Sequence, residues 1–220
     1  MTFYDHLVVQ TAQARDRMRA CPLVTRALAG EVSLAEYRLF LEQAYHHVKH
    51  TVPLLMACGA RLPERLAWLR TAIVRYIGEE DGHETWILDD LAAIGGDPNA
   101  VRGGLPLTAT ELMVAYAYDT IHRGNPAGFF GMVYVLEGTS VALAHAVAGA
   151  LQRHLRLPDQ ALRYLTSHGS VDQGHVRFLE TLLNRLESEE DQAAVLHAAQ
   201  VFFRLYREMF GAIGAYCLSC

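Results

Sequence analysis

The segment FFGMVYVLEGTSVALAHAVAGAL, residues 129–151, decides the fold. Apolar residues occupy more than one face of a helix drawn at 3.6 residues per turn, so the segment predicts a central helix surrounded by other helices. Glu137 stands inside this segment, with apolar residues on both sides. A buried carboxylate is costly unless it is neutralised, hydrogen-bonded, paired or bound to a metal. The residue that marks the centre of the fold therefore requires a partner.

The remainder of the 220-residue chain also predicts helices with short connections, and its sequence contains no alternating β-branched runs of the kind that form strands. We therefore expect an all-α fold in a single domain, residues 1–220, built as a bundle of about seven helices. Capping residues mark four helix starts, at Ser33–Glu36, Asp97–Pro98, Thr108–Glu111 and Asn125–Pro126. The expected helices span roughly residues 4–19, 33–58, 63–94, 109–122, 126–154, 159–186 and 190–216.

Composition restricts the class of function. A chain that is 51% hydrophobic and 20% charged suits a soluble globular protein with a sizeable core. The net charge of −5, with no basic segment interleaved with aromatic residues, argues against a nucleic-acid partner. We expect no membrane span and no secretory signal, and therefore a cytoplasmic protein with reduced cysteines. The terminal CLSC, residues 217–220, is a single C-x-x-C pair to which we assign no role.

Two further segments place acidic residues and histidines at helical spacing. In YIGEEDGHETWILDDL, residues 76–91, Glu80 and His83 are three residues apart and share a helix face. In SHGSVDQGHV, residues 167–176, His168, Asp172 and His175 follow one another at spacings of four and three. Glu-x-x-His is the spacing by which one helix presents a carboxylate and an imidazole to a metal pair.

The candidate metal ligands are therefore three carboxylates and three imidazoles. Oxygen and nitrogen ligands of this kind suit iron or manganese and leave positions open for dioxygen and a substrate. Taken singly, each segment also fits an ordinary structure: an exposed acidic turn, a polar helix end, or a core carboxylate bonded to a tyrosine or histidine. Their combination in one chain favours the metal. The full set is Glu80, His83, Glu137, His168, Asp172 and His175.

A pocket beside the metal is expected to include residues from neighbouring turns. Glu42 and His46 are four residues apart in EQAYHHVKH, residues 42–50, and could contact either the metal ligands or the substrate. Phe130 and Tyr134 lie one or two turns before Glu137 and would wall the pocket, although plain core packing explains them equally well.

The order of these motifs resembles the haem-oxygenase-like di-iron oxidases. This branch belongs to the superfamily that also includes thiaminase-II-like (TenA-like) and pyrroloquinoline-quinone-synthase-like proteins. The resembling segments cover nearly the whole chain: YHHVKHTVPLL, IGEEDGHETWILDDL, VYVLEGTSVALA and YLTSHGSVDQGHVRFLE.

The resemblance implies a helical bundle around a central pocket that binds two ferrous ions, with manganese as the alternative metal. It implies a dioxygen-dependent oxidase or oxygenase that acts on a small organic acid, amino acid or fatty acid, and a homodimer. Haem is not expected, because the segment around His6 does not match that of the haem-binding members. Some members of the branch supply their first carboxylate at the position of Tyr76, so the resemblance implies that Glu80 takes that role here, and Tyr76 is expected among the pocket residues.

Two alternatives remain open. The protein could be a metal-free TenA-like or pyrroloquinoline-quinone-synthase-like enzyme or binding protein, in which the same residues hydrogen-bond a small molecule. It could also be a ferritin-like bundle that oxidises or stores iron, with Glu42 as an additional ligand and His168 as a surplus residue.

Overall fold

The computed structural model describes the backbone of residues 1–219 and the side chains of residues 1–167 and 174–217. Within this part of the chain every regular element is a helix, so the expected all-α class is confirmed. Three short 3-10 turns accompany the α-helices, at Glu64–Leu66, Pro126–Gly128 and Asp159–Ala161. The α-helices are α1 (Phe3–Gln10), α2 (Ala12–Arg19), α3 (Pro22–Ala29), α4 (Leu34–Val48), α5 (Thr51–Arg61), α6 (Ala67–Glu80), α7 (His83–Ala93), α8 (Pro98–Gly103), α9 (Thr108–His122), α10 (Phe129–Leu155), α11 (Arg163–Leu183) and α12 (Glu189–Ser219).

The expected number of about seven helices is wrong, because the described residues form twelve. Three of the expected long helices are interrupted: 4–19 divides at Thr11, 33–58 at Lys49–His50, and 63–94 at Asp81–Gly82. Gly82 adopts the left-handed conformation, with φ of 86°, which glycine tolerates and which ends a helix. Two short helices, α3 and α8, were not expected at all.

Three of the four expected helix starts are confirmed. Ser33 and Glu36 form a reciprocal capping box at α4, and the side chains of Asp97 and Asn125 accept backbone N–H groups of the following turn. The box expected at Thr108 is wrong, because Leu107 is the residue that precedes α9. The side-chain oxygen of Gln43 on α4 instead accepts the Leu107 N–H and the Thr110 hydroxyl, each at 2.8 Å. A side chain distant in sequence therefore fixes the start of α9, although it does not cap the helix.

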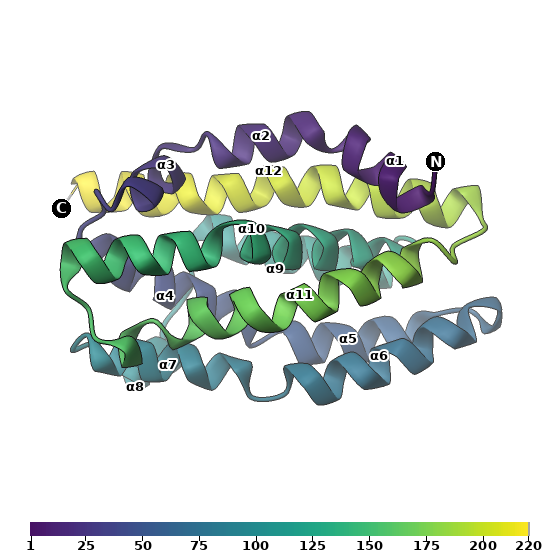
Figure 1. The fold of residues 1–220 in the computed structure, drawn as a ribbon. Coiled ribbons are helices and arrows are strands. Elements are labelled where there is room, and N and C mark those ends of the chain that lie inside the picture. The colour runs from purple at the N-terminus through teal and green to yellow at the C-terminus, as the bar shows by residue number, and fades with distance from the viewer. Residues whose placement is uncertain (220) are drawn as a thin grey trace.

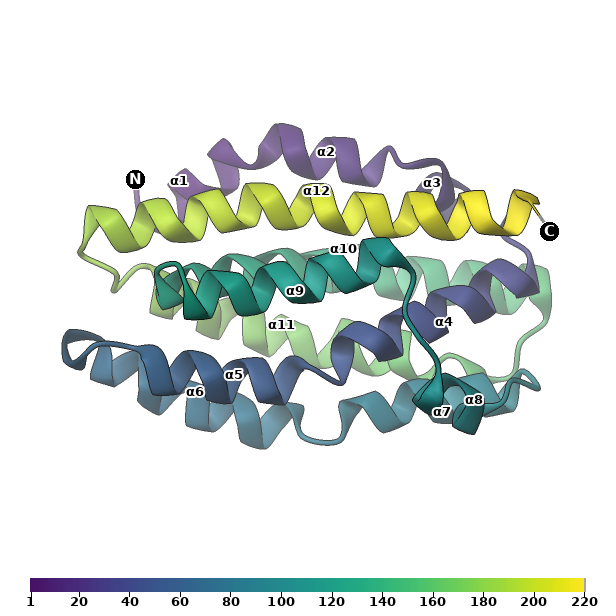
Figure 2. The same ribbon diagram turned by 180° about the vertical axis from the view of Figure 1, so that it is seen from behind.

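Helix α10 is the central element, as its sequence predicts. It packs most extensively against α11 and α12, and also contacts α3 and α9. Figure 1 shows α1–α3 following one side of α12, while α5, α6 and α7 form the opposite edge of the bundle. The reverse view places α9 in front of α10 and α4 obliquely below them (Figure 2). The side chains that face inward thus come from helices distant in sequence.

Residues 126–155 are long and apolar enough to cross a membrane by composition alone. However, 61% of the most apolar window of this segment is buried inside the protein. Such burial is typical of the core helix of a soluble domain, because the neighbouring helices already cover its apolar surface.

Candidate metal centre

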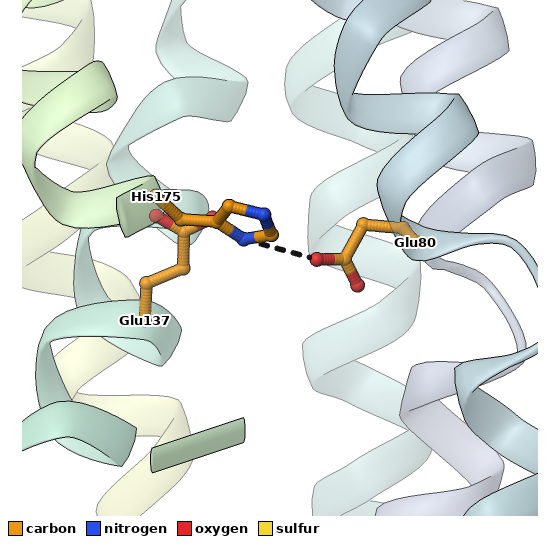
Figure 3. A group of neighbouring side chains, drawn as sticks. All are labelled: Glu80, Glu137 and His175. Carbon is orange, nitrogen blue, oxygen red and sulfur yellow. Dashed lines mark ion pairs between the residues drawn. The ribbon is translucent and has the colours of Figure 1, made fainter. Parts of the chain in front are cut away.

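Three of the predicted ligands converge from three helices at the middle of the bundle. Glu80 is the last residue of α6, Glu137 lies near the middle of the central helix α10, and His175 lies on α11. One potential ligand atom from each lies within 4.8 Å of the others. The Nδ1 atom of His175 is 3.3 Å from Glu80 Oε1 and 3.5 Å from Glu137 Oε1. Figure 3 shows the His175 ring between the two carboxylates.

All three side chains are buried. Glu80 and Glu137 are each 9% exposed and His175 is 4% exposed. Two carboxylates at this depth have lost their solvation and repel each other. A positive charge between them offsets both costs. The arrangement therefore meets the requirement that the sequence raised for Glu137.

His83 also contacts the cluster, but it comes from a different helix than the sequence predicted. It is the first residue of α7, not a member of the helix that carries Glu80, because the chain turns at Asp81–Gly82. Its Nδ1 atom is nevertheless 3.1 Å from Glu80 Oε2, and its ring stacks on Trp86 with centroids 4.1 Å apart. The Glu-x-x-His pair is thus brought together across a helix break.

Glu79 also contacts the cluster, although it was absent from the predicted ligand set. Its Oε2 atom is 3.0 Å from His175 Nε2, and Arg75 Nε donates to its other oxygen at 2.8 Å. Helical phase over an unbroken 63–94 helix favoured Glu80 over Glu79 as the partner of His83. Glu79 is identified as a neighbour only by the position of His175. The Nε2 atom of this ring faces Glu79, and its Nδ1 atom faces Glu80.

The electrostatics of His175 show what charge the site demands. Burial alone would lower the pKa of His175, but hydrogen bonds and attraction from Glu137 and Glu80 outweigh this effect and raise the pKa to about 10. The imidazolium then supplies the positive charge that the carboxylates require. A divalent cation would do the same with the imidazole neutral, since metal binding displaces ligand protons. The donor set, two carboxylates with imidazole nitrogen at the same point, fits an iron or manganese ion.

A cavity of about 90 Å³ opens beside the two carboxylates. We call it the carboxylate chamber; its lining includes His47, Leu55, Tyr76, Glu80 and Glu137. Tyr76 is 1% exposed, and its ring packs against the His175 ring with centroids 5.4 Å apart. The chamber therefore gives a small molecule access to the carboxylates in otherwise mainly apolar surroundings.

The remaining predicted residues lie elsewhere or outside the described side chains. His46 is 3% exposed but neighbours Lys49, and Glu42 is half-buried on α4; neither belongs to the three-residue cluster. Phe130 packs against Phe129 in the core. The hydroxyl of Tyr134 is 3.1 Å from that of Thr11, beside a different cavity. The side chains of His168 and Asp172 lie outside the described residues.

A family model and solved structures relate this chain to known proteins. A family model described as "Iron-containing redox enzyme" matches residues 38–207. Among curated proteins, the search of the sequence finds no significant match.

Solved structures share the fold over nearly the whole chain. A domain of unknown function with a haem-oxygenase-like fold from Shewanella denitrificans superposes with a TM-score of 0.86 at 24% identity, covering 99% of this chain and 94% of that one. A TenA homologue from Pseudomonas syringae gives 0.82 at 14% identity, covering 97% and 93%. Haem oxygenase-1 from the cyanobacterium Synechocystis, in complex with haem, gives 0.78 at 12% identity, covering 100% and 95%. These similarities confirm the haem-oxygenase-like fold.

Proposed function

Because the chain belongs to the iron-containing redox enzyme family, we propose that it is a non-haem iron oxidase or oxygenase that uses dioxygen. The observation that carries this proposal is the convergence of Glu80, Glu137 and His175 from three helices. Their ligand atoms fit one ferrous ion, and His83, His168 and Asp172 are the proposed further ligands of a second ion. Manganese is the alternative metal. We propose a cytoplasmic homodimer with a small organic acid, amino acid or fatty acid as substrate.

Ferrous iron in this site would supply electrons to dioxygen for oxidation of a substrate beside it. The side chains of the protein control the proton at the metal site, exclude water and position the substrate. His175 must lose its Nδ1 proton, which faces Glu80 and Glu137, before that nitrogen can bind a cation. Tyr76 and the apolar walls of the carboxylate chamber exclude bulk water and hold the substrate next to the carboxylates.

The size of the carboxylate chamber supports a site without haem. Its volume of about 90 Å³ is well below the roughly 300–1,000 Å³ of clefts that enclose drug-sized ligands. Haem is larger than most such ligands. An absorption spectrum of protein titrated with haemin tests this point, since a Soret shift that saturates at one equivalent would contradict it.

A metal-free function is the second candidate, and one observation favours it. The His175 imidazolium already supplies one positive charge between the two buried carboxylates, so a cation is not the only possible source of positive charge at this site. The fold shared with a TenA homologue is compatible with such a protein. The iron-storage alternative has less support, because Glu42, its additional ligand, is not part of the three-residue cluster.

Anaerobic titration with ferrous iron separates these candidates. We expect up to two ions per chain, with binding strongly weakened in Glu137→Gln and retained in Glu111→Gln, whose carboxylate is exposed on α9. The loaded protein is then exposed to oxygen in the presence of candidate acids. Acceleration of iron oxidation by one of them supports the oxidase, whereas failure to bind iron favours the metal-free function.

A further inference from the structure

A second cavity, which is almost entirely apolar, adjoins the carboxylate chamber. Its volume is about 100 Å³, and we call it the apolar chamber. Leu143, Ala144 and Val147 of α10 form one wall, and aromatic rings that include Phe40 and Phe210 form the other. The Phe40 and Phe210 rings are stacked with centroids 6.4 Å apart, so this wall is a continuous apolar surface.

Glu36 is the one charged residue among the described residues that line the apolar chamber. Its carboxylate is already engaged, because both terminal nitrogens of Arg26 and the Ser33 backbone N–H donate to it. The Tyr37 hydroxyl likewise donates to the Ala161 carbonyl at 2.6 Å. The polar groups of Glu36 and Tyr37 are therefore committed to the protein, and the chamber offers a ligand mainly carbon surface.

Three residues line both chambers: Ser140, Tyr164 and Tyr206. Ser140 follows Glu137 by three residues on α10 and so lies on nearly the same helix face. Its Oγ atom is buried and has no hydrogen-bond partner in the part of the chain that the structure describes. A buried hydroxyl in this state is satisfied by a polar atom of a ligand or by water.

We propose that the substrate has a polar head in the carboxylate chamber, hydrogen-bonded to Ser140, and an apolar group that fills the apolar chamber. The head is anionic, because a carboxylate complements the cations that Glu80 and Glu137 would hold. This inference rests on the proposed function for the head and on the apolar chamber alone for the tail. An apolar cavity of about 150 Å³ accommodates benzene, so a chamber of about 100 Å³ holds roughly four to six carbons. The substrate class is therefore a carboxylic acid with a short apolar chain or a single ring.

The first test concerns the apolar chamber and needs no metal. Benzene is titrated into the metal-free protein and binding is followed by calorimetry. We expect binding to wild type and to Ala146→Phe, which adds the same ring on an exposed face of α10, and no binding to Ala144→Phe, which fills the chamber. Absence of benzene binding to wild type, or binding that Ala144→Phe leaves unchanged, overturns the proposal.

The second test measures the affinity of ferrous-loaded, anaerobic protein for n-alkyl carboxylates from butanoate to decanoate. Each added methylene should tighten binding about fourfold until the chamber is full, after which the affinity levels off. Ser140→Ala should weaken every acid by about threefold to tenfold without changing this dependence on chain length. A flat series in protein that binds iron refutes the proposal.

The two tests distinguish a failure of the proposed function from a failure of the ligand assignment to the apolar chamber. If iron does not bind, the proposed function fails, and benzene still decides whether the apolar chamber takes a ligand. If Ala144→Phe does not fold, Val147→Ala replaces it, because deleting two methyl groups from the wall enlarges the chamber. That variant should extend the fourfold increments by about one to two methylenes, and an unchanged limit would overturn the assignment.

Discussion

The close approach of α10 and α12 at Gly131 provides a quantitative test of the packing that positions Glu137. A Cβ atom at this position would lie 2.5 Å from the Val195 carbonyl oxygen and 2.6 Å from the Ala199 backbone nitrogen. Both contacts are with backbone of α12, which cannot rotate away as a flexible side chain could. Gly131→Ala therefore requires the two helices to separate.

Overpacking of this kind costs about 1–3 kcal/mol, and the higher helix propensity of alanine returns up to about 1 kcal/mol. Because both contacts are with backbone, the upper part of this cost applies, and we expect Gly131→Ala to lower the free energy of unfolding by about 1–2 kcal/mol. For a chain of this length the loss corresponds to a melting temperature lower by about 2–8 °C. The matched control is Gly211→Ala in the interior of α12, where an added Cβ meets nothing within 4 Å. That variant should raise the melting temperature by about 2–4 °C.

Thermal unfolding followed by circular dichroism at 222 nm measures both changes. The two glycines lie inside helices, so propensity alone would shift both variants upward. Opposite signs thus isolate the contact between α10 and α12. A melting temperature for Gly131→Ala equal to or above that of Gly211→Ala would refute the packing described here.

Three further predictions follow from other residues. Glu42→Gln should leave the stoichiometry of ferrous binding unchanged in an anaerobic titration, and loss of an ion would favour the ferritin-like alternative. Burial, together with Lys49 and His50, lowers the pKa of His46 from 6.5 to about 4. The unfolded chain therefore binds a proton at His46 more readily than the folded protein does, so the stability present above pH 6.5 is lost as the pH falls from 6.5 to 4. This loss in the free energy of unfolding is at most about 3 kcal/mol. Measured by urea unfolding, the free energy of His46→Gln should decrease less between pH 6.5 and 4 than that of the wild type, and an identical decrease would contradict the assignment. Asp191→Ala removes the acceptor of bonds from Arg65 and Asn125, so we expect a loss of about 2–3 kcal/mol, and a change below 0.5 kcal/mol would be inconsistent with it.

The sequence predicted the fold class because helical patterns run through the whole chain without strand patterns. It predicted the central position of α10 because apolar residues occupy more than one face of that segment. The interruption at Asp81–Gly82 was missed, since glycine inside a helical pattern can be tolerated or can end the helix, and only packing decides which. The hydrogen bonds that fix the start of α9 were missed for a related reason. Their acceptor, Gln43, is distant in sequence and has no local signal.

For the candidate site, helical spacing identified Glu80, Glu137 and His175, which the structure brings within ligand distance of one another. Spacing could not identify Glu79, because its contact with His175 depends on how α6 and α11 are placed. Nor could it identify the apolar chamber. Phe40, Tyr206 and Phe210 converge on that chamber from α4 and α12, and each alone looks like an ordinary core residue.

The central claim is that the carboxylates of Glu80 and Glu137 and the imidazole of His175 hold iron. Anomalous diffraction at the iron absorption edge, from crystals grown anaerobically with ferrous iron, tests it most directly. We predict a peak within bonding distance of all three side chains, and its absence from crystals of His175→Ala. An empty cluster with the His175 ring still between the two carboxylates, or iron bound only at the surface, would contradict the claim.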